Sequence, residues 1–319
     1  MRELLRTTNL VRLSWVQALL AESKIHAVVL DSHMSVLEGS ANAIPRRLAV
    51  SDDDYPAAVR VLEESGELGG KRPERATDGL LGGRITLLQP ENGYRAAVDP
   101  VLLAAAVPAV ATNVLDVGCG TGAAALCYAE RAVDAQVVGL ELQPEMAHLA
   151  IENVRLNGME DRVSIHIGSL LNSPPALEAG SFDEVMANPP YLPAERADLR
   201  TPPADVTATV EGDATLKDWI AFCLEMAALR GFVTMIHRAD RLDEILALLQ
   251  ECAGDIVVFP IWPGTGANGF PRDARRVIVR ARKGANGPMR LAAGMVLHDG
   301  DEYSDAADAI LRLGQPLAI

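Results

Sequence analysis

Hydrophobic and polar residues alternate in short blocks along the chain, and the spacing of these blocks changes near residue 79. Before residue 66 the blocks follow the order strand, helix, strand, strand, helix, which predicts a small α+β domain. Asn9 can cap the first helix through its side-chain oxygen. The expected strands are 3–7, 25–30 and 47–50, and the expected helices are 9–23 and 54–64.

A stretch with few residues to bury separates this block from the rest of the chain. Residues 65–79 read SGELGGKRPERATDG and are rich in glycine and charge. Such a composition is typical of a linker. The sequence therefore predicts a small docking or signal-transducing domain at 1–66, a linker at 67–78 and a larger domain at 79–319.

In the larger domain, β-rich segments alternate with segments of helical periodicity. This alternation predicts a doubly wound, mostly parallel α/β sheet. A loop instead of a helix joins the last two strands, so one strand is expected to run antiparallel at the end of the sheet. The expected strands are 113–117, 136–142, 163–167, 183–187, 232–236, 256–261 and 277–280, and the expected helices start at 123 and span 144–157, 216–229 and 239–252.

Composition narrows the classes of protein. A chain of 319 residues with 49% hydrophobic residues can bury a core, which excludes wholesale disorder. The net charge of −14 excludes a strongly basic nucleic-acid coat, although it leaves room for a local basic patch. The longest apolar run, 101–111, is too short to span a bilayer. The four cysteines lack CxxC spacing. We therefore expect a cytoplasmic protein without a membrane contact or a metal site.

A glycine-rich turn, residues 114–122 (VLDVGCGTG), closes one strand and opens a helix. Gly118, Gly120 and Gly122 let a ligand approach backbone N–H groups at the helix N-terminus. Glu141 follows at the end of the next strand, where a carboxylate can accept both ribose hydroxyls of an adenosine. Asp116 precedes the first glycine, where it favours a bound ammonium group and would repel the pyrophosphate of a dinucleotide.

The tetrapeptide Asn188-Pro189-Pro190-Tyr191 ends a strand at the same edge of the sheet as the glycine turn, and ligands of open α/β sheets bind at that edge. The Asn188 side-chain oxygen and the Pro189 carbonyl can accept both N–H bonds of an amide or exocyclic amino group. The prolines hold these acceptors rigidly. Tyr191 offers a ring face on which a planar base or amide can stack.

These segments resemble those of class I S-adenosylmethionine-dependent methyltransferases. The sequences DVGCGTG, GLELQPEMAHLAIENVRLNG and FDEVMANPPYLP, preceded by GYRAAVDPVLLAAA and followed by VEGDATLKDWIAF and IHRADRLDEIL, are similar to the bacterial tRNA (valine) adenine-N6-methyltransferase family over residues 79–313. The resemblance implies a Rossmann-like class I methyltransferase sheet, S-adenosyl-L-methionine as cofactor, and methylation of the 6-amino group of the adenosine beside the anticodon. The first 65 residues resemble a short bacterial domain described as signal-transducing.

The resemblance also implies roles for single residues. Asp116, Gly118, Gly120 and Glu141 correspond to the cofactor site, and Asn188 to Tyr191 correspond to the catalytic tetrapeptide. Asp99 is expected near the methionine end of the cofactor. Many relatives carry an acid that reads the adenine amino group after the third strand, whereas this chain has Ser169, which can hydrogen-bond more weakly than a carboxylate.

A basic strip runs from Arg272 to Arg290, where Asp273 is the sole acidic residue. It is interpreted either as a phosphate-tracking contact for tRNA or as a solvated surface. The sequence does not decide between a structural and a functional role for His237, Glu211 and Asp213. The strip's basic residues are Arg272, Arg275, Arg276, Arg280, Arg282, Lys283 and Arg290.

Three alternatives to tRNA adenine methylation stay open. The same chemistry could act on a glutamine amide of a release factor, because those methyltransferases also carry NPPY. A nicotinamide-dependent oxidoreductase also fits the loose glycine pattern, but it would leave the tetrapeptide without a role. In the last alternative the chain is a non-catalytic regulator that binds the ligand without turning it over.

Overall fold

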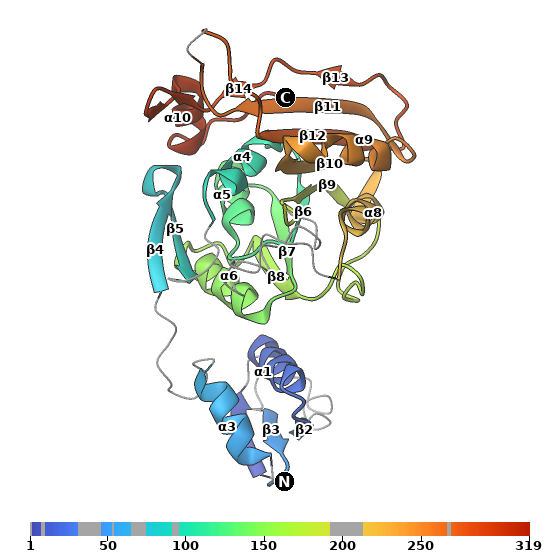
Figure 1. Ribbon diagram of the computed structural model, residues 1–319. Coiled ribbons are helices and arrows are strands. Elements are labelled where there is room, and N and C mark those ends of the chain that lie inside the picture. Colours follow the sequence, from blue (N-terminus) through green and yellow to red (C-terminus); the bar gives the residue numbers. More distant parts are fainter. Residues whose placement is uncertain are drawn as a thin grey trace. The chain divides into compact units, whose positions relative to one another are not determined.

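The computed structural model describes residues 2–7, 10–30, 46–52, 54–64, 75–90, 96–191, 213–266 and 269–319. The chain folds as two compact units, Met1–Arg75 and Ala76–Ile319 (Figure 1). Asn9 and the expected linker residues 67–74 lie outside the described residues. The last residues of the expected linker belong to strand β4, Arg75–Leu80.

The first unit is a three-stranded antiparallel sheet with the order β1-β3-β2, and helices α1 and α3 pack against it. A bulge between Glu3 and Leu5 shifts the register of β1, so Leu4 and Leu5 are both buried although they are neighbours in sequence. Trp15 and Leu20 of α1 complete this core. The elements are β1 (Arg2–Thr7), α1 (Leu10–Glu22), β2 (Val28–Leu30), β3 (Arg46–Val50) and α3 (Tyr55–Glu64), which is the predicted order.

A sheet with the strand order β13-β11-β12-β10-β9-β6-β7-β8 forms the centre of the second unit. Strands β8, β7, β6, β9 and β10 are parallel, as the alternating pattern predicts. Strand β12 runs antiparallel to both β10 and β11, which confirms the antiparallel strand at the end of the parallel part. The strands are β6 (Asn113–Val117), β7 (Gln136–Glu141), β8 (Val163–Ile167), β9 (Phe182–Ala187), β10 (Ala227–Arg238), β11 (Ala253–Trp262) and β12 (Arg276–Lys283).

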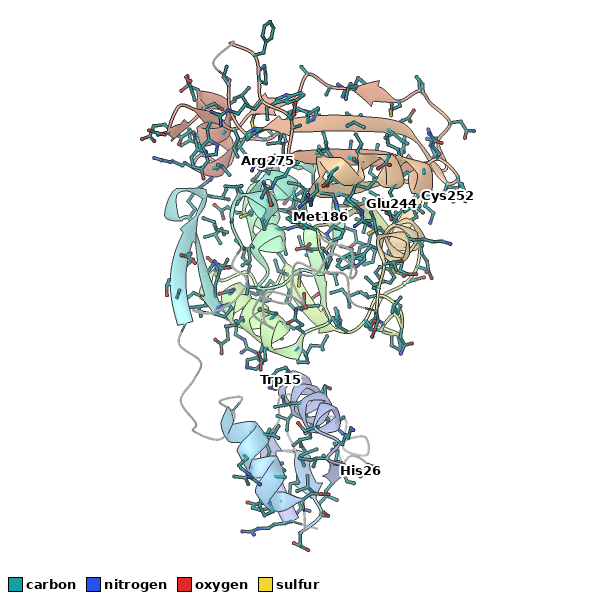
Figure 2. The ribbon with its side chains drawn as sticks, viewed as in Figure 1. Trp15, His26, Met186, Glu244, Cys252 and Arg275 are labelled. Carbon is teal, nitrogen blue, oxygen red and sulfur yellow. The ribbon has the colours of Figure 1, made fainter. Side chains whose placement is uncertain are left out.

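Helices cover both faces of this sheet (Figure 1). Because side chains alternate along a strand, Val114 joins one core and Leu115 the other. Figure 2 shows the side chains that fill the space between sheet and helices, including Met186 of β9. One face carries α4 (Val98–Ala106), α5 (Ala123–Arg131) and α6 (Pro144–Leu156), and the other carries α8 (Leu216–Met226) and α9 (Leu242–Leu249).

The β4–β5 hairpin docks onto α6 through asparagine amides. Asn157 accepts from the Thr86 N–H at 2.9 Å and donates to the Thr86 carbonyl at 2.8 Å. Asn153, one helical turn earlier, does the same for Leu88 at 2.7 and 2.9 Å. The two amides thus replace a neighbouring strand along the edge of β5 (Ile85–Pro90).

Two helix ends differ from the predicted ones. The helix expected at 216–229 ends at Met226, because Ala227 leaves helical geometry with φ −63° and ψ 138° and starts β10. The helix expected at 239–252 begins as the short 3-10 helix η3, and its α-helical part is Leu242–Leu249. Several elements were not predicted: the β4–β5 hairpin with its connecting 3-10 helix η1 (Leu81–Gly83), helix α4, and the small C-terminal elements β13 (Arg290–Leu291), β14 (Met295–Val296), β15 (His298–Asp299), β16 (Glu302–Tyr303) and α10 (Asp305–Leu311).

Candidate active site

Strand register brings the glycine turn and the tetrapeptide to the same edge of the sheet. Val117, the last residue of β6, pairs with Ala187, the last residue of β9, so Gly118 and Asn188 leave adjacent strands side by side. We call this edge, where β6, β7, β8 and β9 end, the carboxyl rim. A cavity of about 250 Å³ opens there. Its lining includes Asp116, Gly118, Gly120, Glu141, Ser169, Asn188, Pro190, Asp213 and Trp219.

The glycine turn has a backbone that other residues would strain. Gly118, Gly120 and Gly122 have φ of 69°, 56° and 86°. A Cβ on Gly118 would come within 2.4 Å of the Trp219 ring, whereas a Cβ on Gly120 would meet nothing within 4 Å. Gly118 therefore allows Trp219 to close one side of the cavity, while Gly120 leaves space free for a ligand.

Glu141 is buried and holds the turn in place. One of its carboxylate oxygens accepts from the Gly120 N–H at 2.8 Å, and the other accepts from the Gln143 N–H at 2.8 Å. Burial raises its pKa, and the two backbone hydrogen bonds oppose that change. Each carboxylate oxygen keeps a lone pair, so Glu141 can still accept hydroxyl groups from the cavity.

Asp116 faces the cavity and the first turn of α5. Its Oδ2 accepts from the Ala125 N–H at 3.1 Å. Burial raises the pKa of Asp116 to about 8; the hydrogen bond from Ala125 lowers it, and the charge of Glu141 raises it further. A cationic ligand group in the cavity would therefore favour the ionised form.

The tetrapeptide is anchored through its last residue. The Tyr191 hydroxyl lies 2.6 Å from Asp99 Oδ2 and 2.9 Å from Asn188 Oδ1. Asp99 is buried in the first turn of α4, and its Oδ1 forms an ion pair with Arg276 Nε at 2.5 Å. The structure thus brings Asp99 to the tetrapeptide and not to the lining of the cavity. Pro189 is buried.

Ser169 lies on the cavity wall after β8. Its hydroxyl accepts from the Leu171 N–H at 3.1 Å, and its backbone forms an isolated bridge with Asn172. Because a hydroxyl can donate while it accepts, Ser169 can still offer a hydrogen bond to a ligand.

Comparisons with known proteins agree with this geometry. The family "Methyltransferase domain" matches residues 114–201, and the family "Putative prokaryotic signal transducing protein" matches residues 1–66. A tRNA1(Val) (adenine(37)-N6)-methyltransferase of Aeromonas salmonicida is 30% identical over 215 residues, which cover 66% of this chain and 86% of the relative. The enzyme of the same name from Porphyromonas gingivalis is 31% identical over 170 residues, covering 51% of this chain and 66% of the relative.

The chain belongs to this methyltransferase family. It is an S-adenosylmethionine-dependent N-methyltransferase. A solved structure from Agrobacterium tumefaciens, described as a predicted O-methyltransferase, has a TM-score of 0.56 at 24% identity and covers 69% of this chain and 99% of that chain. This similarity shows the class I methyltransferase fold.

The cavity of the methyltransferase fits its cofactor by its shape and polar groups. Gly120 leaves open space beside the buried carboxylates of Glu141 and Asp116, which are suited to ribose hydroxyls and to an ammonium group. In the described part of the chain, no group of three or more His, Cys, Asp or Glu side chains could hold a metal ion. Among those residues, no helix is long and apolar enough to cross a membrane.

His237 is fully buried beside the tetrapeptide. Its ring contacts the Tyr191 ring edge-on, with 5.6 Å between centroids. Burial, helped by the charge of Arg241, lowers the pKa of His237 to about 4. The imidazole is therefore neutral at pH 7 and packs behind Tyr191.

The basic strip from Arg272 to Arg290 divides into two parts with different surroundings. Arg276 begins β12 at the carboxyl rim. In the antiparallel strand register it lies opposite Arg238, the last residue of β10. A second hollow at this point is lined by Tyr191, Arg238, Asp240, Ala274, Arg275 and Arg276.

At the other end of β12 the basic side chains also have structural partners, as Arg276 has in Asp99. Arg280 forms an ion pair with Glu184 at 2.8 Å and stacks on Phe232. Arg282 donates to the Arg230 carbonyl at 3.0 Å, and Lys283 donates to the Ala227 carbonyl at 2.7 Å. These residues hold strands together, so the strip is not one continuous surface.

Sequence reasoning missed several residues that line the cavity. Trp219 lies in the first turn of α8, directly after the capping box formed by Thr215 and Asp218. A tryptophan in the first turn of a helix that begins near the rim was the sequence signal that could have indicated this cavity residue. Gln89 is buried at the end of β5, where its amide oxygen accepts from the Ala96 N–H at 2.6 Å. Asp213 does line the cavity, whereas Glu211 lies outside the described residues.

Proposed function

We propose that this methyltransferase transfers the methyl group of S-adenosylmethionine to the 6-amino nitrogen of an adenine in tRNA. The relatives from Aeromonas and Porphyromonas carry this activity in their names. The observation that carries the proposal is that the glycine turn and Asn188 line one cavity. A donor held on the turn can therefore face an amino group held by Asn188.

The chemistry needs alignment more than a strong base. An exocyclic amino nitrogen is a poor nucleophile because its lone pair is delocalised into the ring. Acceptance of its N–H bonds by Asn188 Oδ1 and the Pro189 carbonyl would leave the lone pair directed at the methyl group. The cofactor supplies that methyl group in electrophilic form, on a sulfonium.

The proton of the amino group becomes acidic once the nitrogen carries the methyl group, and it can then leave to water. A neutral His237, buried behind Tyr191 with its pKa lowered to about 4, is a poor candidate for a base at this step. The proposed mechanism therefore uses acceptors and a stacking ring but no catalytic histidine.

Residues of the turn would hold the cofactor. We assign the ribose hydroxyls to Glu141, the ammonium group to Asp116, and a hydrogen bond to the adenine amino group to Ser169. Gly118, Gly120 and Gly122 would let the cofactor approach the backbone. Each of these residues except Gly122 lines the cavity.

The charge beside the tetrapeptide favours RNA over a protein amide. Arg238, Arg275 and Arg276 line a hollow together with Tyr191, the residue on which the base would stack. Arg276 is already paired with Asp99 and Arg238 with Asp240, so Arg275 is the first candidate for a phosphate contact. A nucleotide seated on Tyr191 would bring its backbone phosphates near these guanidinium groups. A glutamine side chain would bring no such charge.

Methyl uptake by defined RNAs tests this function. The full chain, incubated with methyl-labelled cofactor and an unmodified valine tRNA transcript, should yield N6-methyladenosine after nuclease digestion. The matched control is the same transcript with guanosine at position 37, which should take up no label. Label in a release factor and none in either RNA would overturn the proposal.

We also propose that the first unit docks a partner or regulates the enzyme. It has a core of its own, and the residues proposed for catalysis, Asn188 to Tyr191, belong to the second unit. A chain that starts at Ala76 should keep the turnover of the full chain on a transcript. A loss of turnover by a folded truncated chain would assign the first unit to substrate binding.

A further inference from the structure

Two acceptor oxygens lie within hydrogen-bond distance of the Tyr191 hydroxyl, which has only one proton to donate. The hydroxyl carries a single proton, yet it lies 2.6 Å from Asp99 Oδ2 and 2.9 Å from Asn188 Oδ1. Neither oxygen can donate, since a carboxylate and an amide oxygen are both acceptors. One of the two contacts must therefore involve a different proton.

The Asp99 carboxylate is the stronger hydrogen-bond acceptor for the Tyr191 proton. It is charged, it lies closer, and it is buried with its other oxygen paired to Arg276. A hydrogen bond from a hydroxyl to a charged acceptor is shorter and about twice as strong as one between neutral groups. Tyr191 therefore donates to Asp99, and its oxygen is left as an acceptor, toward Arg276 and toward Asn188.

An acceptor in that place requires the amide nitrogen of Asn188 as its partner. The oxygen and nitrogen of an asparagine side chain have nearly the same shape, so the hydrogen-bond network decides which of them occupies each position. With Nδ2 donating to the Tyr191 oxygen, Oδ1 takes the other position of the amide and is free of Tyr191, and Asn188 lines the cavity. That is the orientation in which Asn188 can accept an N–H bond from a substrate amino group.

We propose that Asp99 is a positioning residue that sets the orientation of the Asn188 amide through Tyr191. The proposal rests on the proposed function, because it gives a reason why Asn188 Oδ1 faces the amino group. Arg276, on a different strand, holds Asp99 in place. This role differs from a contact with the methionine end of the cofactor, since Asp99 is not part of the cavity lining.

A double-mutant cycle tests the relay. Tyr191→Phe keeps the stacking ring but removes the hydroxyl, and Asp99→Asn removes the charged acceptor. Each variant should lower kcat about 10- to 100-fold, with KM for the transcript and Kd for the cofactor changed less than about twofold. The double variant should be no slower than the slower single variant, because Asp99 acts through Tyr191.

Two outcomes would overturn the relay. If the losses multiply in the double variant, Asp99 acts independently of Tyr191. If Asp99→Asn weakens cofactor binding while kcat stays unchanged, Asp99 belongs to the cofactor site. Asp183→Asn is the matched control, since Asp183 also accepts from a hydroxyl, Thr112 Oγ1 at 2.8 Å, but lies at the opposite edge of the sheet. It should leave kcat unchanged.

A spectroscopic readout keeps the relay testable even if tRNA is not the substrate. In full-length protein labelled with ¹⁵N-asparagine, the side-chain NH2 of Asn188, assigned by its loss in Asn188→Ala, should be protected from solvent exchange. In Tyr191→Phe the same NH2 should lose that protection. An unprotected Asn188 NH2 in the wild-type protein would refute the relay, whereas absent methylation of every RNA would refute only the proposed function.

Discussion

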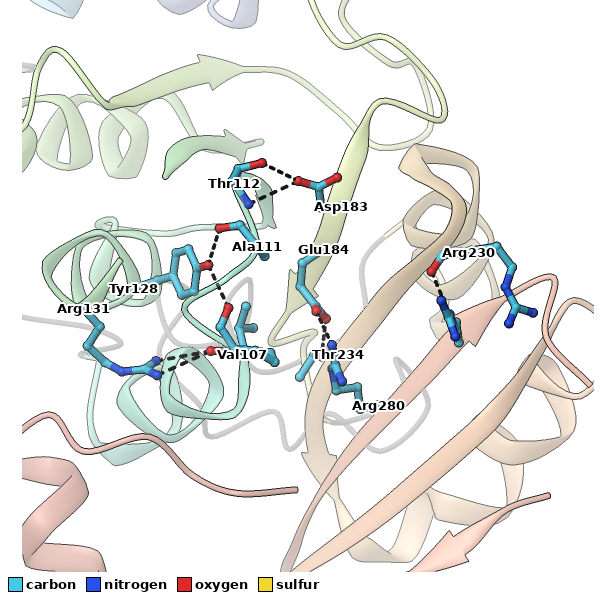
Figure 3. A network of polar contacts seen from close by, with 12 residues as sticks. Val107, Ala111, Thr112, Tyr128, Arg131, Asp183, Glu184, Arg230, Thr234 and Arg280 are labelled. Atoms are coloured by element: carbon cyan, nitrogen blue, oxygen red, sulfur yellow. Dashed lines mark hydrogen bonds and ion pairs between the residues drawn. The ribbon is translucent and has the colours of Figure 1, made fainter. Parts of the chain in front are cut away.

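The two edges of the central sheet are built for different purposes. At the carboxyl rim the strands end at a cavity lined by Asp116, Glu141 and Asn188. At the opposite edge, the amino rim, where β6 and β9 begin, the polar groups contact one another across short distances (Figure 3). Asp183 there accepts from the side chain and backbone of Thr112 at 2.8 and 3.2 Å.

Other side chains close the amino rim in the same way (Figure 3). The Tyr128 hydroxyl donates to the Ala111 carbonyl at 2.7 Å, and Arg131 reaches the carbonyls of α4 and of Val107. The hydrogen bonds of these groups hold helices and strands of the protein together. The groups at the carboxyl rim keep spare acceptor capacity, so substitutions at the two places should separate catalysis from stability.

The largest separation is expected at Asn188. Asn188→Ala removes the acceptor that aligns the amino group, so kcat should fall by about 100- to 1,000-fold, the range for loss of one preorganised polar contact to the reacting group. Asn188 is only partly buried at the rim, so its removal should lower the free energy of unfolding by no more than about 1.5 kcal/mol, the order of the one hydrogen bond it shares with Tyr191. Single-turnover kinetics and urea denaturation measure the two effects. A large loss of stability would remove the distinction between the rims.

Glu184 should show the opposite behaviour. It is 1% exposed between β9, β10 and β12, where it pairs with Arg280 and accepts from the Thr234 hydroxyl at 2.5 Å. Burial raises its pKa, and the Arg280 charge opposes this. Glu184→Ala leaves a buried charge without its partner and should cost about 3–5 kcal/mol in urea denaturation.

A second substitution checks the cause of that loss. Adding Arg280→Leu to Glu184→Ala removes the orphaned charge and should restore part of the stability. At a temperature where both proteins stay folded, kcat per folded molecule should match that of the wild type. A lower kcat in the folded fraction would connect this network to catalysis.

Much of the parallel sheet could be predicted because its strands obey local rules. Val114, Leu115 and Val117 belong to a short, nearly continuous apolar run, which a strand buried on both faces requires. The glycines that follow this strand predict the turn. The site at the carboxyl rim follows from the same logic, since ligands bind at the edge where parallel strands end.

The remaining features depend on contacts between residues far apart in the sequence. The hydrogen bond between Asp99 and Tyr191 joins residues 92 positions apart, and the contact between Arg280 and Glu184 joins residues 96 positions apart. No local pattern encodes such pairs. The end of α8 was missed because Ala227 to Leu229 continue an apolar run, and Leu229 is 78% exposed although its residue type suggests burial.

A smaller effect at the carboxyl rim is expected on cofactor binding. Glu141→Ala removes the proposed ribose acceptor and the carboxylate that holds the Gly120 N–H. Calorimetry should show binding of S-adenosylmethionine weakened by about 1–3 kcal/mol, the order for losing a charged hydrogen-bond partner. Glu141→Gln, which keeps the shape, should lose less than Glu141→Ala. An unchanged Kd in both variants would take Glu141 out of the site.

The last expected effect is a pH dependence of stability to which Asp116 at the carboxyl rim contributes. Burial raises the pKa of Asp116 to about 8 from 3.8, so between these values the folded chain keeps a proton that the unfolded chain has lost. Stability should therefore fall as pH rises through this window, by up to about 1.4 kcal/mol per pH unit for this group. Asp116→Asn should flatten the slope measured by urea denaturation between pH 5.5 and 7.5. Saturating cofactor should also flatten it in the wild type, because a bound ammonium group favours the ionised carboxylate. Equal slopes in all three cases would mean that Asp116 is ionised in the free enzyme, and its carboxylate would then be stabilised by the N–H groups of α5, just as Asp183 is stabilised at the amino rim.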